Sequence, residues 1–245
     1  MLARYPDGEG CVGAVVYAPP GFDPGTGRAE ETQAQNLADA GAAYVAWDPR
    51  GRVRSEGEED ANGAISQDDF AAVLRWTANQ PRVDPRQVVV YSRSFGGALA
   101  SGALARDETL EPLAWVDYES PGWLRDDLDH ASAHTAERMR SLAMASGDED
   151  AWFDAREPAG FIGDVAVPYH RVQGNPDHAL DTMQAAVAMV NGATSSPEVR
   201  FNGEIVTEPL TEESAQAAAV VGGVNPDGDE MTAAILAAFS VDQTP

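Results

Sequence analysis

The chain has 245 residues, enough for one α/β domain with a sizeable core, and no break in composition divides it into two domains. Its 40 acidic and 16 basic residues give a formal net charge of −24 at pH 7, which argues against nucleic acid and anionic membranes as partners. All the basic residues are arginine. A GC-rich genome would explain the missing lysine but not the excess of acid. Because so acidic a surface repels itself unless salt screens it, the composition predicts a halophilic protein.

The first residues lack the pattern of a secretory signal, and no apolar run approaches the roughly 18 residues of a membrane span. We therefore expect a cytoplasmic protein. The single cysteine, Cys11, excludes a disulfide framework, and its place in an apolar run predicts a thiol packed in the core.

Buried-strand patterns and helical patterns alternate along the chain, which predicts an α/β fold with a doubly wound, mostly parallel sheet flanked by helices. We expect strands at residues 11–18, 43–47, 88–91, 113–118, 165–173 and 198–201. We expect helices at about 29–40, 211–219 and 229–239. Three more are expected: one from residue 66 that Pro81 ends, one that begins at residue 96, and one that ends at about residue 190.

Residues 123–161 break this alternation, since two or three helices follow one another there without a strand. We expect them to form a small helical cap inserted in a single domain that spans residues 1–245. The cap would roof a pocket at the carboxyl edge of the sheet. Its aromatic residues could line an apolar substrate site or simply pack against the sheet: Trp123, Trp152, Phe153 and Phe161.

The sequence Ser92-Arg93-Ser94-Phe95-Gly96 lies between a buried strand and a helix of small residues. This is the strand–turn–helix context of a nucleophile elbow, with serine at the first small position of G-x-S-x-G. A strained turn there presents the Ser94 hydroxyl at the top of the sheet, and the Phe95 N–H at the start of the helix would face a developing oxyanion. The alternative is that Ser94 is a structural serine.

Together these features resemble the α/β-hydrolase superfamily of serine esterases over nearly the whole chain. The resemblance implies that Phe22, in Pro20-Gly21-Phe22, donates the second oxyanion N–H and that Asp177, in Gly174-Asn-Pro-Asp177, is the catalytic acid. It also implies a hydrolase of carboxylic esters that acts on a small acyl substrate and uses neither a metal nor an organic cofactor.

The sequence departs from this family at the catalytic histidine, because no histidine follows His178. Three interpretations remain: His178 is the base, the protein is a catalytically degenerate member that binds a ligand, or water or a carboxylate acts as a weak base. Adjacent residues of an extended loop seldom point at each other, so we expect His178 to pair with Glu119 before Asp177.

Two other patterns could carry chemistry. His130 and His134 are spaced i, i+4 and could bind zinc, but the glutamate of H-E-x-x-H is missing, so we expect a solvated helix instead. Arg93 could bind a substrate carboxylate through two hydrogen bonds or could pair with one of the many acids.

Overall fold

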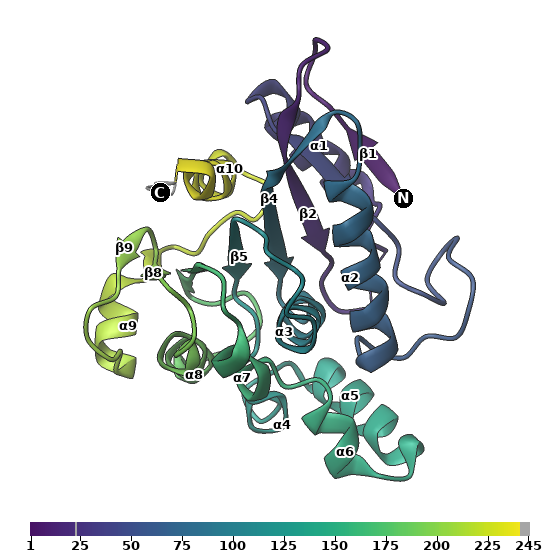
Figure 1. Ribbon diagram of the computed structural model, residues 1–245. Coiled ribbons are helices and arrows are strands. Elements are labelled where there is room, and N and C mark those ends of the chain that lie inside the picture. The colour runs from purple at the N-terminus through teal and green to yellow at the C-terminus, as the bar shows by residue number, and fades with distance from the viewer. Residues whose placement is uncertain (23, 241–245) are drawn as a thin grey trace.

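The computed structural model describes residues 1–22 and 24–240. Within these residues, one sheet holds eight strands in the order β1 (Leu2–Arg4), β3 (Ala43–Ala46), β2 (Val12–Ala18), β4 (Val83–Arg93), β5 (Ala114–Tyr118), β6 (Tyr169–Val172), β8 (Val199–Phe201) and β9 (Glu204–Ile205) (Figure 1). The pairs β1–β3 and β8–β9 are antiparallel, and the pairs between them are parallel. The expected doubly wound, mostly parallel sheet is confirmed.

Helices cover both faces of this sheet, and the valines of β4 divide between the two cores. Val88 and Val90 pack in one core, and Val89 packs in the other, because successive side chains of a strand point to opposite faces. The first core is closed by α2 (Ala64–Ala78), α3 (Gly96–Arg106), α8 (Gln184–Gly192) and α9 (Glu212–Ala218), and the second by α1 (Arg28–Asp39) and α10 (Asp229–Ala237).

Between β5 and β6 the chain forms α4 (Leu124–Asp127), α5 (Ala133–Ser146), α6 (Glu149–Asp154) and α7 (Pro158–Phe161). In Figure 1, α4, α5 and α6 lie beyond the arrowheads of β4 and β5, at the carboxyl edge of the sheet. Trp152 and Phe153 are buried in a cluster with Phe95 and Met139, so these two aromatics pack. Trp123 is 46% exposed.

Several short elements gave no clear pattern in the sequence. These are the edge strands β1 and β9 and a separate parallel pair formed by β7 (Gly174–Asn175) and β10 (Val220–Val221). The strand expected from residue 165 begins only at Tyr169, since Pro168 cannot donate a ladder hydrogen bond.

The prediction of a core thiol is wrong: β2 begins at Val12, and Cys11 just before it is exposed.

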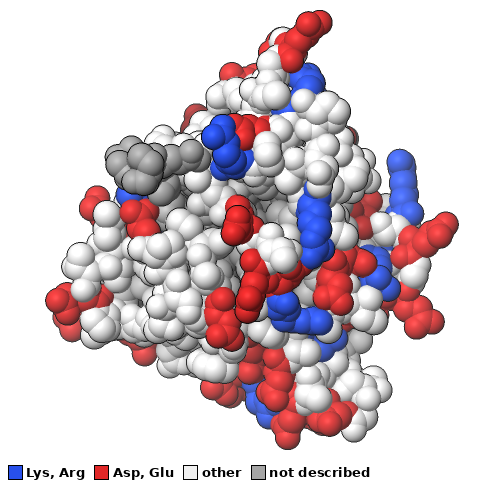
Figure 2. Space-filling view, in the orientation of Figure 1, with Lys and Arg blue, Asp and Glu red and all other residues white. Residues whose placement is uncertain are grey.

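Figure 2 shows acidic side chains scattered across the visible face and along its outline, with fewer arginines among them. In the described part of the chain, no helix has the length and apolar character needed to cross a membrane.

Candidate active site

The turn between β4 and α3 has the strained geometry of a nucleophile elbow. Ser94 has φ of +52°, a conformation that residues with a side chain rarely adopt, and its N–H donates to the Tyr118 carbonyl at 2.9 Å. Glycine is required two residues later, because a Cβ on Gly96 would lie 2.2 Å from the Ala18 carbonyl oxygen. The turn therefore holds Ser94 at the carboxyl edge of the sheet.

Ser94 opens into a pocket of about 500 Å³ that Phe22, Phe95 and His178 also line. The rings of Phe22 and Phe95 lie 6.0 Å apart, so the two loops that carry the expected oxyanion donors meet beside the elbow. Within the described residues, neither the Phe22 nor the Phe95 backbone N–H donates to a protein acceptor. In the part of the chain that the structure describes, both N–H groups are therefore free to bind a ligand.

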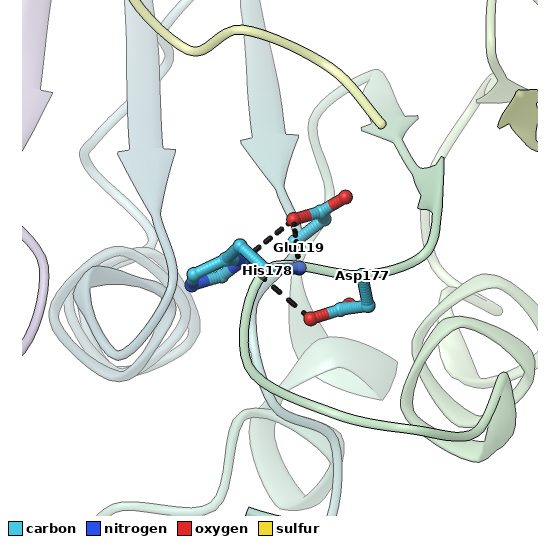
Figure 3. A group of neighbouring side chains, drawn as sticks. All are labelled: Glu119, Asp177 and His178. Atoms are coloured by element: carbon cyan, nitrogen blue, oxygen red, sulfur yellow. Dashed lines mark hydrogen bonds and ion pairs between the residues drawn. The ribbon is translucent and has the colours of Figure 1, made fainter. Parts of the chain in front are cut away.

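The ring of His178 is held by the carboxylate of Glu119. His178 Nδ1 lies 2.5 Å from Glu119 Oε2, and the two side chains point toward each other from the loop after β7 and the end of β5 (Figure 3). The aromatic ring of Tyr118 stacks on the imidazole with 5.5 Å between the ring centroids. With Nδ1 occupied by the carboxylate, Nε2 is the nitrogen left for a substrate or a nucleophile.

Glu119 is buried, and three hydrogen bonds hold its charge. Oε1 accepts the Gly174 N–H at 2.7 Å, and Oε2 accepts the His178 N–H at 3.0 Å in addition to the ring. Burial raises the pKa of Glu119, but the hydrogen bonds from the His178 ring and from the two backbone N–H groups outweigh it and lower the pKa below its ordinary value. The carboxylate therefore stays ionised beside the ring.

Asp177 has other partners. Its Oδ1 accepts the N–H groups of Ala179 and Leu180 at 2.8 and 3.0 Å, and its Oδ2 accepts from Gln173 at 2.8 Å. The distance from Asp177 Oδ1 to His178 Nδ1 is 3.5 Å, longer than a hydrogen bond. Asp177 thus fixes the loop that carries His178, whereas Glu119 bonds to the ring.

The three groups Ser94, Glu119 and His178 follow β4, β5 and the β6–β7 segment in turn, the order that the resemblance implies for nucleophile, acid and histidine. Ser94 and His178 line one pocket, but in the described part of the chain no hydrogen bond joins them. The loop before α10, where the resemblance would put the histidine, supports the ring indirectly: the Val224 carbonyl accepts the Tyr118 hydroxyl at 3.0 Å.

A buried polar network lies beneath the elbow, and sequence reasoning missed it. Arg171 and Asp117, both 0% exposed, pair at 2.7 Å, and Asp117 also accepts the hydroxyls of Ser92 and Tyr169. Arg171 in turn donates to Gln173, the residue that donates to Asp177. The sequence signal for this network is an aspartate and an arginine inside otherwise apolar strands.

The prediction that His130 and His134 lie on one helix is wrong, because α5 begins at Ala133 and His130 precedes it. His130 Nδ1 lies 2.7 Å from Asp181, and His134 lines the pocket wall. In the described residues the group with metal-ligand spacing is Glu119, Asp177 and His178, whose ligand atoms lie within 4.8 Å of one another. Their carboxylate oxygens already accept the N–H groups described above.

Comparisons with known proteins agree with this architecture. A model of the X-Pro dipeptidyl-peptidase (S15) family matches residues 5–116, from just after β1 through the elbow and into β5. A thiohydrolase, apmlB, of Arthrinium phaeospermum is 26% identical over 60% of this chain, and the chain spans about half of that protein, 53% of its length.

Solved structures of hydrolases have the same fold. A puromycin-hydrolyzing peptidase of Mycobacterium tuberculosis is 15% identical with a TM-score of 0.64, over 80% of this chain and 30% of its own. A 2,6-dihydroxy-pseudo-oxynicotine hydrolase is 18% identical with a TM-score of 0.66, over 98% of this chain and 63% of its own. With its mostly parallel sheet and strained serine elbow, the chain has the α/β-hydrolase fold.

Proposed function

We propose that this protein is a serine hydrolase that cleaves a carboxylic ester or a related acyl compound through an acyl-enzyme on Ser94. The observation that carries the proposal is the bond from buried Glu119 to the ring of His178, which lines the pocket onto which Ser94 opens. The relatives named above are hydrolases by their descriptions, which supports hydrolysis as the reaction class.

In this mechanism Ser94 Oγ attacks the carbonyl carbon while His178 Nε2 takes its proton. Glu119 holds the imidazole in the tautomer with hydrogen on Nδ1 and stabilises the imidazolium that forms. The N–H groups of Phe22 and Phe95 stabilise the oxyanion. The leaving group departs with the proton from Nε2, and water then hydrolyses the acyl-enzyme, with His178 as base again.

Neither step calls for a metal or an organic cofactor. A divalent cation held by Glu119, Asp177 and His178 would instead compete with the hydrogen on Nδ1. Chelation with EDTA is therefore expected to leave turnover unchanged, and a loss of activity that added metal restores would overturn this part of the proposal.

A second candidate is a catalytically degenerate protein that binds a ligand in the same pocket. The observation that favours it is the absence of a hydrogen bond between Ser94 and His178 in the described residues, although such bonds often form only when substrate is bound. Under this candidate the pocket and oxyanion donors would bind an acyl compound without cleaving it.

The test is incubation with a fluorophosphonate, followed by intact mass measurement and peptide mapping. The proposal predicts one adduct, on Ser94, in the wild type, and none in Ser94→Ala. It also predicts much slower labelling of His178→Ala, because the serine then lacks its base. Folded wild-type protein that takes up no label would favour the degenerate candidate.

A further inference from the structure

The pocket at Ser94 differs in charge from the rest of the molecule. The chain carries 40 acidic residues against 16 basic ones, yet the charged residues among the described lining of the pocket are two arginines, Arg93 and Arg138, and no aspartate or glutamate. A cationic pocket in so acidic a protein attracts an anion and repels a cation.

Arg138 supplies one cation at this pocket. It comes from α5, and its guanidinium lies over the Phe22 ring, 3.9 Å from the ring centroid. Among the described residues it has no carboxylate partner, whereas Arg140, two residues further along the same helix, is bonded to Asp129. Stacking fixes the plane of the guanidinium and leaves its N–H edge free for a ligand.

Arg93 is the second cation, and it lies next to the nucleophile. Its nearest acid is Asp227, at 3.9 Å, the longest arginine–carboxylate pair in the described part of the chain. The other such pairs are 3.3 Å or shorter. The side chain of Arg93 is 25% exposed, so a carboxylate of a ligand could approach it.

A second cavity at Ser94 has a different character. With a volume of about 50 Å³, it adjoins the first and is walled by Pro121, Leu124, Leu128 and Leu180. Glu119 and Asp127 also line it, so an anion would be repelled there. With space for only a few heavy atoms, this cavity suits a short uncharged acyl group.

We propose that the substrate joins a short uncharged acyl group to a leaving group that carries a carboxylate, and that Arg93 and Arg138 bind this carboxylate. The inference rests on the proposed function, because the scissile carbonyl has to lie at Ser94, which lines both cavities. It adds the substrate class: an acyl ester of a hydroxy acid, with the charge on the side that leaves.

The test compares two chromogenic esters of similar shape, 4-nitrophenyl acetate and 3-carboxy-4-nitrophenyl acetate, at one fixed salt concentration. Binding to Ser94→Ala is measured first, by calorimetry, so that the result does not depend on turnover. We expect the carboxylated ester to bind at least about tenfold more tightly, as hydrogen bonds to a charged group allow. Adding Arg138→Gln should remove most of that preference.

Arg140→Gln is the matched control, since it removes a charge from the same helix without touching the pocket. Equal affinity for the two esters, or an equal loss in Arg138→Gln and Arg140→Gln, would overturn the proposal. Arg93→Gln provides a second variant with the same expected loss. Preference for the carboxylated ester in a protein whose Ser94 resists the fluorophosphonate would support this inference and contradict the hydrolase function.

Discussion

Glu119 and His178 are 59 residues apart in the chain, yet the Glu119 carboxylate and the imidazole are hydrogen-bonded at 2.5 Å. Glu119 directly follows β5, which pairs with the elbow strand β4. The histidine that the superfamily pattern puts before the last helix is absent here. Under the proposed function, the acid instead comes from the end of β5 and the histidine from the loop after β6 and β7. Chain order is kept although the positions of both partners differ from the pattern.

Glu119→Gln is expected to lower kcat far more than Asp177→Asn. The amide in Glu119→Gln can no longer stabilise the imidazolium, and losses of about 10³ to 10⁴ follow when the acid of such a triad is replaced. Asp177 bonds mainly to backbone N–H groups, so its amide variant should lose about tenfold or less. Steady-state kinetics on a chromogenic acetate ester measure both. A larger loss in Asp177→Asn would make Asp177 the acid.

Gly174→Ala should displace the Glu119 carboxylate. A Cβ at residue 174 would lie 2.8 Å from the Gly223 Cα and 2.9 Å from Glu119 Oε1. We expect a loss of about 1–3 kcal/mol in the free energy of unfolding, as for other overpacked sites, together with a fall in kcat. Urea unfolding and ester kinetics measure the two effects. Gly10→Ala is the control, because nothing lies within 4 Å of a Cβ there.

The sequence carried enough information for the sheet and the elbow. Runs of β-branched residues such as Val88–Val90 are buried on both faces and identify the central strands, while the small residues around Ser94 identify the turn. Short edge strands such as β9, with two exposed residues, leave no hydrophobic period to detect.

The polar contacts of the site were harder to predict. The pairing of Arg171 with Asp117 joins two neighbouring strands whose register depends on the whole sheet. Likewise, the stacking of Arg138 on Phe22 depends on how α5 lies over the carboxyl edge. Sequence spacing gives the period of each element, but contacts between distant elements are fixed only by packing in three dimensions.

Asp127→Asn is expected to stabilise the fold at pH 8. Burial raises the pKa of Asp127 from its ordinary value of 3.8 to about 6, against the opposing hydrogen bond from the Gly122 N–H. Because the folded pKa is the higher one, protonation favours the folded state: the stabilisation is complete below pH 4 and is lost as the pH rises through 6. A shift of about two pKa units changes the free energy of unfolding by about 3 kcal/mol at most.

Unfolding curves at pH 3.5 and pH 8 measure this effect. The asparagine keeps an acceptor for Gly122 without the charge, so it should exceed the wild type in stability at pH 8 but not at pH 3.5. Asp126→Asn, at an exposed neighbouring position, is the control and should show no such difference. A variant equally destabilised at both pH values would contradict the prediction.

Salt should raise the melting temperature of this protein. With a formal net charge of −24, repulsion between acidic side chains opposes folding, and many of them lie on one face in Figure 2. The Debye length falls from about 10 Å at 0.1 M salt to about 3 Å at 1 M, which screens that repulsion. For a chain of this size, each kcal/mol gained raises the Tm by about 2–4 °C.

Thermal unfolding in KCl from about 0.1 to 3 M measures the dependence, and the double variant Glu56→Gln/Glu58→Gln separates screening from other effects of salt. Both glutamates are exposed, and neither takes part in an ion pair in the described residues. Removing their charges should raise the Tm at 0.1 M salt more than at 3 M. If the wild-type Tm stays constant over this range, the halophilic interpretation of the acidic composition is wrong, because repulsion then contributes little to stability.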